Sequence, residues 1–204
     1  INPSYGAKEH TTCDKIMDKI DVDGLKKPTF RDNVILAYSA WGNSDEYFSK
    51  EVLDLMKSPQ WLASDTAILY IQNEGAYIQD HPQRDEQGQV IMDKDTLSAR
   101  LTNGDSTIRF VEFGYAIDEI EDWSENKFVE ALCGDRKTAE MLSKMTQNYS
   151  EISKLDVFSN EHLNASERVA FASLETSEHF DRLEVGGVHH NEFQSGCFAY
   201  GLSK

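Results

Sequence analysis

The sequence predicts an α/β protein in which a central mixed sheet is flanked by helices and followed by a helical C-terminal extension. Two compact apolar runs, residues 33–40 (NVILAYSA) and 65–72 (DTAILYIQ), are each bounded by polar residues, which is typical of buried strands. Between them, Phe48, Val52 and Met56 recur at four-residue spacing and indicate an amphipathic helix. A strand, a helix and a strand in this order form a βαβ unit, so we expect the two strands to be parallel neighbours.

The segments around this unit follow in chain order. A helix is expected at residues 11–20, where the apolar residues form one stripe. The polar run at residues 73–93 is expected to be an exposed loop with a hairpin around Gly88. A short helix, two neighbouring strands and a further helix opened by Ser124 are expected next, at residues 97–101, 106–113, 115–120 and 124–134.

The last third of the chain has a different pattern. Apolar residues between positions 141 and 155 keep a helical period, and Asn164 with Glu167 three positions later forms a capping box for a second helix. A short strand region is expected last, at residues 188–193 and 198–202. The chain therefore divides into an α/β domain and a mainly helical extension packed on it, residues 1–134 and 135–204.

The chain of 204 residues is strongly acidic. Its 36 acidic and 20 basic side chains give a formal net charge of −16. Because this charge repels phosphate backbones and anionic lipid surfaces, we expect neither nucleic acid nor a membrane as a partner. No apolar run approaches the roughly 20 residues that a membrane-spanning helix needs. The charge serves solubility or adaptation to a salty medium, or it indicates a protein partner with a basic surface.

The order of the central elements is similar to that of a known superfamily. Trp41 directly follows the first predicted strand, and residues 48–53 (FSKEVL) continue as a helix. Residues 66–72, 106–120 and 124–132 then supply a strand, a hairpin with a central glycine and a closing helix. This order resembles the thioredoxin-like superfamily over residues 33–134, which implies a thioredoxin-like central sheet.

Two departures from the family pattern decide the chemistry that the resemblance implies. Gly42 and Asp45 occupy the positions of the family's two cysteines, so no thiolate is present there to attack a disulfide. The family's proline before the third strand is also missing from residues 106–108. The resemblance therefore implies a redox-inactive protein that needs no cofactor and acts by binding.

The turn after the first predicted strand is the expected binding site. Open α/β sheets bind their ligands at the carboxyl ends of their strands. We therefore expect a ligand or partner at the residues of this turn, which are Trp41, Gly42, Asn43, Ser44 and Asp45.

A second interpretation is an enzyme. Cys13, then His189 or His190, then Asn191 follow the chain order of papain-like cysteine hydrolases, and a helix N-terminus would lower the pKa of the Cys13 thiol. The same histidines could instead ligate zinc or iron. In a strand, however, His189 and His190 point to opposite faces, and no HxH or HExxH spacing occurs. We therefore predict no metal and no catalytic residue.

The leading prediction is a non-catalytic thioredoxin-like protein that serves as a protein-binding or assembly module. The cysteine hydrolase or metalloenzyme built on Cys13 with His189 or His190 is the first alternative. The second is an acidic accessory protein that binds a basic partner or mimics nucleic acid.

Overall fold

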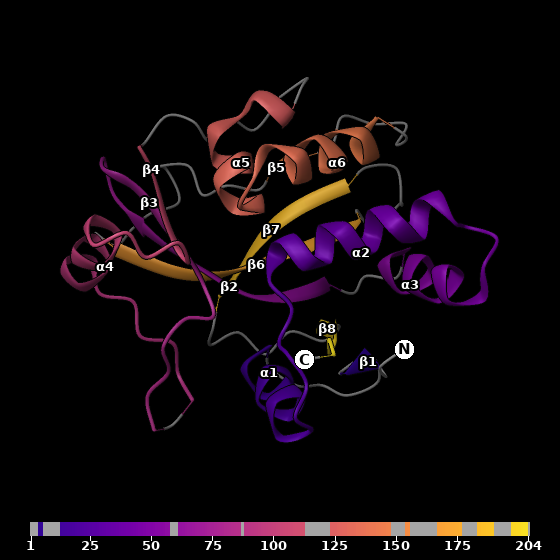
Figure 1. The fold of residues 1–204 in the computed structure, drawn as a ribbon, viewed down its shortest axis with the longest axis horizontal. Helices are drawn as coiled ribbons and strands as arrows, with labels where there is room; N and C mark the ends of the chain where they lie inside the picture. Colours follow the sequence, from indigo (N-terminus) through magenta and orange to yellow (C-terminus); the bar gives the residue numbers. More distant parts are fainter. Residues whose placement is uncertain are drawn as a thin grey trace.

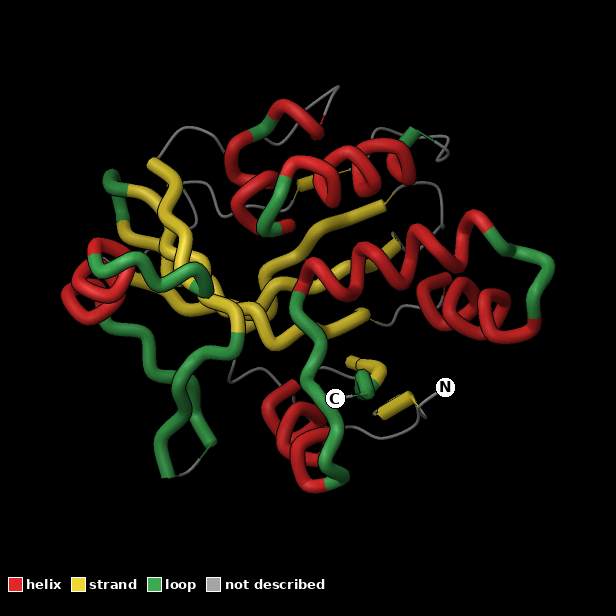
Figure 2. The backbone as a smooth tube through the Cα atoms, in the orientation of Figure 1, coloured by secondary structure: helices red, strands yellow, loops and turns green. Residues whose placement is uncertain are grey.

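The computed structural model describes an α/β protein (Figures 1 and 2). The described residues are 4–5, 13–57, 61–86, 88–112, 123–147, 154–155, 167–176, 183–189 and 197–203. Their helices are α1 (Cys13–Val22), α2 (Phe30–Gly42), α3 (Tyr47–Lys57), α4 (Lys94–Thr102), the 3-10 turn η1 (Trp123–Glu125), α5 (Lys127–Cys133) and α6 (Arg136–Thr146). Their strands are β1 (Ser4–Tyr5), β2 (Trp61–Ile71), β3 (Gly75–Asp80), β4 (Ile108–Glu112), β5 (Lys154–Leu155), β6 (Glu167–Thr176), β7 (Leu183–His189) and β8 (Cys197–Tyr200).

The strands form one mainly antiparallel sheet with β2 at its centre. β2 pairs antiparallel with β6 along one side and with β3 along the other. The first two residues of β2, Trp61 and Leu62, pair in parallel with β8. β7 and then β5 follow β6, and β4 follows β3. β4 and β5 therefore lie at opposite ends of this sheet among the described strands.

Helices cover both faces of the sheet. The largest hydrophobic cluster joins α2, α3, α5 and α6 to β2 and β6, and Figure 1 shows these helices along one side of the long strands. On the other face, α4 contributes Leu97 to a smaller cluster with β2, β3 and β4. A third cluster packs α1 against β8 and Tyr5 of β1, and β1 and β8 lie side by side in Figure 1.

The middle of β2 contains an irregularity that buries polar groups. Its register against β6 shifts between Ala63 and Ala67, as at a β-bulge. Ser64, Asp65 and Thr66 lie in this interval, and all three are buried. A bulge leaves residues outside the regular ladder. Here the Ser64 hydroxyl donates to the Ala172 carbonyl of β6 at 2.6 Å, and the Thr66 hydroxyl donates to Asp80 of β3.

The predicted strand at residues 33–40 is wrong, because these residues lie in the middle of α2. A capping box starts the helix, with the Thr29 hydroxyl accepting from the Asp32 amide and the Asp32 carboxylate accepting from the Thr29 amide. The buried residues Asn33, Val34, Ala37 and Ala40 recur at helical spacing. The expected βαβ unit and its parallel strand pair are therefore absent, since helix α2 takes the place of its first strand.

The prediction of a helix from Asn164 is also wrong. Glu167 begins β6, which pairs along most of its length with β2 and β7. Leu155 lies in β5, so the helical period does not continue to that residue. α6 is the only helix described after residue 135, and the mainly helical extension is therefore corrected to one helix followed by strands of the central sheet.

Other predicted elements are present. The helices at residues 47–57, 94–102 and 127–133 and the strand at residues 108–112 agree with the expected types, and a left-handed Gly134 caps α5. The hairpin around Gly88 is confirmed by the bridge between Arg84 and Val90, but the polar run before it contains the buried strand β3. The predicted strand at residues 115–120 lies outside the described residues. The thioredoxin-like resemblance stays a prediction, now without its first strand.

Candidate functional site

The predicted binding residues form the turn between α2 and α3, rather than the end of a strand. Trp41 and Gly42 are the last residues of α2, Asn43 is its C-cap, and Tyr47 begins α3. The Asn43 amide side chain donates to the carbonyl of Ser39 at 2.8 Å, which closes the end of the helix. The site therefore depends on a connection between two helices.

The turn carries exposed aromatic side chains. Tyr47 is 85% exposed and Trp41 is 40% exposed. The Trp41 ring packs beside that of Tyr38 on the preceding helical turn, with ring centroids 5.7 Å apart. This contact gives the Trp41 ring a support while leaving part of its surface to solvent. Large aromatic side chains of this kind are enriched in protein interfaces.

Acidic residues accompany these aromatics. Asp45 and Glu46 precede α3, and Glu51 and Asp54 lie on it; all four are exposed. Lys50 is the one basic residue of the segment from residue 41 to residue 54. The turn therefore combines apolar contact area with negative charge, which suits a basic partner surface.

The residues of the predicted enzyme site are only partly described. Cys13 begins α1 and His189 ends β7, and the structure describes the backbone of both but neither side chain. His190 and Asn191 lie outside the described residues. The hydrolase alternative therefore stays a prediction. In the part of the chain that the structure describes, no group of three or more His, Cys, Asp or Glu side chains could hold a metal ion.

Cys133 is a free cysteine on α5, and its side chain is buried. Burial raises the pKa of its thiol well above the ordinary value, and the nearby Asp135 carboxylate raises the pKa further. A thiol in this state is a poor nucleophile. Cys133 is therefore a core residue and no candidate for catalysis.

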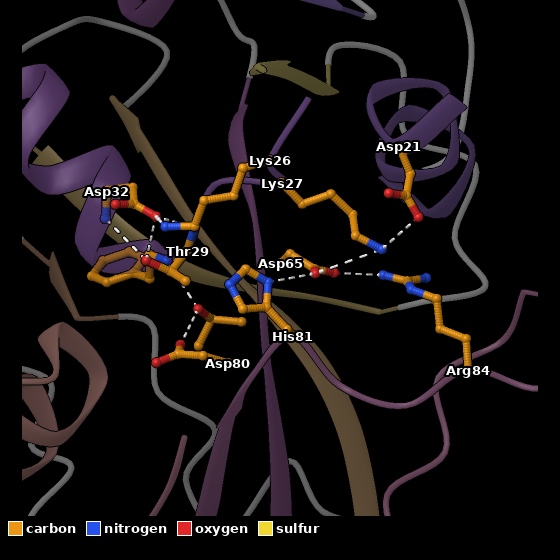
Figure 3. A network of polar contacts seen from close by, with 11 residues as sticks. Asp21, Lys26, Lys27, Thr29, Asp32, Asp65, Asp80, His81 and Arg84 are labelled. Atoms are coloured by element: carbon orange, nitrogen blue, oxygen red, sulfur yellow. Dashed lines mark hydrogen bonds and ion pairs between the residues drawn. The ribbon is translucent and has the colours of Figure 1, made fainter. Parts of the chain in front are cut away.

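A second polar cluster is centred on Asp65 in the irregular part of β2 (Figure 3). The Asp65 side chain is 1% exposed. Its Oδ1 accepts from Nη2 of Arg84 at 2.8 Å, and its Oδ2 lies 3.0 Å from Nδ1 of His81. Nζ of Lys27 lies 3.9 Å from Oδ2. Figure 3 shows these three side chains converging on one carboxylate from different parts of the chain.

The neighbouring side chains determine the charge state of the Asp65 carboxyl group. Burial alone would raise the pKa of this carboxyl, but hydrogen bonds from His81 and Arg84 and the positive charges of Arg84 and Lys27 outweigh burial. The net effect lowers the pKa below its ordinary value, so Asp65 is a carboxylate at neutral pH. Because a carboxylate can only accept, Nδ1 of His81 is the donor in their hydrogen bond.

His81 is held in an unusual backbone conformation. Its φ of 53° lies in the left-handed region, which costs energy for a residue with a Cβ atom. Its amide donates to the Asp65 carbonyl at 2.8 Å, so backbone and side chain both contact the same residue. The ring is 41% exposed. A left-handed residue at the end of β3 turns the chain from the sheet into the hairpin.

The neighbouring residues extend the cluster to α2 and β4. The Thr66 hydroxyl donates to Oδ1 of Asp80 at 2.6 Å and accepts from the Phe30 amide at 2.9 Å. Oδ2 of Asp80 accepts from Nη1 of Arg109 at 2.6 Å. The start of α2, two central strands and β4 are thus joined by one series of hydrogen bonds.

These contacts indicate a structural role for the cluster. A histidine oriented by a carboxylate can act as a general base when a nucleophile or substrate lies in reach. Among the described residues, the His81 ring makes its hydrogen bond to Asp65 alone. The Asp65 carboxylate also forms ion pairs with Arg84 and Lys27. Arg84 also lies over the Phe171 ring, 5.5 Å from its centroid. The cluster therefore fastens the hairpin and the Lys27 segment onto β2.

Sequence reasoning did not identify this cluster. The sequence places Asp65 at the polar boundary of an apolar run. It places His81 and Pro82 in the polar segment that is predicted to be an exposed loop. The available signal was a charged residue between the apolar pairs Leu62–Ala63 and Ala67–Ile68. A charge inside such a stretch is buried only when it is paired.

The fold and these two sites define an α/β protein with a mainly antiparallel sheet and an exposed acidic and aromatic helix connection. Comparison of the chain with models of protein families, with curated proteins and with solved structures found no match. Among the described helices, none is long and apolar enough to cross a membrane.

Proposed function

We propose that the protein is a non-catalytic protein-binding module that contacts a basic partner surface through the α2–α3 turn. The observation that carries this proposal is the exposure of Trp41 and Tyr47 at one helix connection, beside Asp45 and Glu46. Binding energy at protein interfaces is concentrated in a few residues, among which tryptophan and tyrosine are enriched. The net charge of −16 supports a basic partner, because opposite charges speed association.

The polarity of the turn also supports reversible association. A fully apolar patch would favour permanent burial, whereas a mixed aromatic and charged surface is typical of partners that also exist separately. Trp41 is held against Tyr38, so less side-chain freedom is lost when a partner covers it. The turn can therefore present a preformed contact surface.

Photo-crosslinking can test the proposal. A photoreactive phenylalanine derivative at position 47 is expected to capture a partner, whereas the same group at position 22 on α1 is not. Val22 is a matched control because its side chain is 84% exposed and lies outside the turn. The captured protein is then purified and titrated against the unmodified chain.

The titration decides the outcome. The double substitution Trp41→Ala and Tyr47→Ala is expected to weaken the affinity by about tenfold or more, since aromatic anchors commonly contribute about 2 kcal/mol or more. Val22→Ala is expected to leave the affinity unchanged. A basic partner also binds less tightly as salt concentration rises. Equal affinity of the double variant and the unmodified chain would refute a role for this turn.

A further inference from the structure

The outer edge of β4 is open in the described part of the structure. β4 pairs with β3 on one side, and no described strand pairs with its other side. An unpaired strand edge presents backbone donors and acceptors that can accept another strand. In Figure 1 this edge and the α2–α3 turn lie on opposite sides of the molecule, so a role of this edge goes beyond the function proposed above.

The register shows which backbone groups face outward. The amide of Asp80 donates to the carbonyl of Thr107 at 3.0 Å, which makes these two residues a hydrogen-bonded pair. Hydrogen-bonded pairs alternate along an antiparallel ladder, so Arg109 and Val111 also face β3. The backbone groups of Phe110 and Glu112 consequently face away from β3.

Most of these outward groups have no backbone partner among the described residues. The Ile108 amide donates to the Asp105 carbonyl at 3.2 Å and is satisfied. No described backbone group bonds to the outward amides and carbonyls of Phe110 and Glu112. Within the described part of the chain, two donors and two acceptors along this edge thus have no backbone partner.

A groove of about 520 Å³ runs beside these groups. Residues 109–112 of β4 form one wall, and α5 with its cap forms the other through Lys127, Glu130, Ala131 and Gly134. Consecutive side chains of a strand point to opposite faces of a sheet. Four consecutive residues of β4 line the groove, so it reaches groups of both faces of this strand. The small residues Ala131 and Gly134 leave room for a chain between β4 and α5.

The charged residues of the groove indicate which peptide side chains it would favour. Glu112 and Glu130 are exposed, and no described ion pair engages them. Arg109 also lines the groove, but its Nη1 is bound to Asp80 at 2.6 Å. Lys127 adds one positive charge at the start of α5. With the net charge of −16, the groove favours cationic side chains.

We propose that the groove between β4 and α5 binds an extended peptide segment that carries lysine or arginine at alternate positions, and that this segment joins the sheet as an additional strand. Its backbone pairs with Phe110 and Glu112, and this pairing supplies most of the affinity. Side chains on one face of the peptide lie against Ala131 and Val111. Its cationic side chains lie near Glu112 and Glu130.

A short edge strand with charged residues can also serve only to prevent edge association. The position of α5 favours peptide binding over deterrence. A helix beside an open strand edge creates a groove whose side chains can select a peptide. Deterrence alone would need neither the groove nor the small residues on α5.

The test uses fluorescence anisotropy with a labelled, end-blocked octapeptide of alternating valine and lysine. The same peptide N-methylated at its four central residues keeps its charge but loses its central backbone donors. We expect the first peptide to bind and the methylated peptide to bind at least tenfold more weakly. Equal binding of the two peptides would overturn strand addition and indicate charge attraction alone.

Protein variants locate the site. Glu130→Lys is expected to weaken peptide binding about fivefold or more, and Ala131→Phe, which fills the groove, about tenfold or more. Glu140→Lys on α6 is the matched control, because Glu140 is also exposed and, among the described residues, its ion pair is with Arg136. A similar loss with Glu140→Lys as with Glu130→Lys would overturn the assignment of the groove. Because Glu130 is exposed, its variant remains informative if Ala131→Phe does not fold.

Two further outcomes are decisive. Trp41→Ala with Tyr47→Ala is expected to leave peptide affinity unchanged, so this proposal and the proposed role of the turn can fail separately. A dimer of the unmodified chain in size-exclusion chromatography with light scattering, split by Ala131→Phe, would overturn the peptide assignment. In that case a second copy of the chain would be the occupant of the edge.

Discussion

Oδ2 of Asp65 lies 3.0 Å from Nδ1 of His81, although the two residues are 16 positions apart in the chain. The same carboxylate binds Arg84 through its other oxygen at 2.8 Å. Asp65 is thus the common acceptor for the turn after β3 and for the hairpin beyond it. A buried charge with several partners is costly to form, but removing one member leaves the others uncompensated.

Asp65→Asn is therefore expected to destabilise the fold strongly. The substitution removes the negative charge that compensates Arg84 and Lys27, whose side chains are 11% and 19% exposed. Breaking a buried ion pair in this way typically costs about 3 to 5 kcal/mol. Urea unfolding followed by circular dichroism measures the difference.

Glu140→Gln on α6 is the control for this variant. It removes an exposed i,i+4 ion pair with Arg136, for which the expected loss is about 0.5 kcal/mol or less. If Asp65→Asn cost no more than this control, the cluster would not stabilise the protein.

The contribution of Asp65 should disappear in acid. The folded-state pKa of Asp65 is lower than its ordinary value of 3.8. A lowered carboxyl pKa stabilises the fold above the unfolded-state pKa, and this stabilisation is lost as pH falls through the folded-state pKa. The difference in unfolding free energy between the unmodified chain and Asp65→Asn is expected to be steady from pH 7 to 5 and to shrink below about pH 4.

Urea titrations at pH 7, 5, 4 and 3 check this expectation. Asp105, whose pKa is lowered to about 2 by hydrogen bonds from Thr107 and Arg100, is present in both proteins. Its acid dependence therefore cancels in the difference. A difference that stayed constant to pH 3, or widened, would contradict the assigned state of Asp65.

Sequence patterns correctly predicted helices such as α3 and α5, which bury one face and expose the other. α3 has its buried residues, such as Val52 and Met56, at helical spacing, and α5 ends at a glycine, so both were predictable. Residues 33–40 were assigned to a strand because a short apolar run does not distinguish a strand from a buried helix. The capping box of Thr29 and Asp32 was the signal that separates them.

The remaining errors have a common physical cause. β6 has five consecutive buried residues from Ala170 to Leu174, so it lacks the alternation that identifies a strand covered on one face. β3 is also buried almost throughout, although polar residues surround it in sequence. The predicted binding residues lie in a turn between two helices rather than at the end of a strand, so the reason for choosing them does not hold in this fold, and their binding role stays a prediction. The exposure of this turn depends on α3 packing beside α2, which is a tertiary property.

His81 offers a test of backbone strain. Replacement by alanine or glycine removes the same hydrogen bond to Asp65, but only glycine adopts a φ of 53° without steric cost. We expect His81→Gly to be more stable than His81→Ala by about 1 kcal/mol. Thermal unfolding of the two variants measures this order.

At Lys137 on α6, the alanine variant is expected to be more stable than the glycine variant, the reverse of the order at His81. This exposed residue is the second of α6. Glycine is about 1 kcal/mol less favourable than alanine in a helix interior, and the same preference, smaller in the first turn, applies at this position. The pair Lys137→Gly and Lys137→Ala should therefore rank in reverse. If alanine were the more stable replacement at position 81 as well, the His81 conformation would contribute no strain.

Gly75 is the residue that permits β3 and β4 to pair at the start of β3. Its φ is 153°, and a Cβ atom there would lie 2.1 Å from the backbone carbonyl oxygen of Val111. Because this contact is with backbone rather than with a flexible side chain, Gly75→Ala must displace the end of β4. We expect a loss of stability of about 2 kcal/mol or more, as for overpacked sites and strained backbone.

Gly42→Ala is the matched control, since the residue is helical and the added Cβ would have no described atom within 4 Å outside its chain neighbours and its own helix backbone. It should be neutral or slightly stabilising. Amide hydrogen exchange gives the local readout, because Gly75→Ala should speed exchange of the Arg109 and Val111 amides, which face β3. If exchange in β4 were unchanged, the close approach of Gly75 to Val111 would not hold this strand in place. The peptide groove depends on the same strand, so Gly75→Ala should weaken binding of the valine and lysine peptide as well.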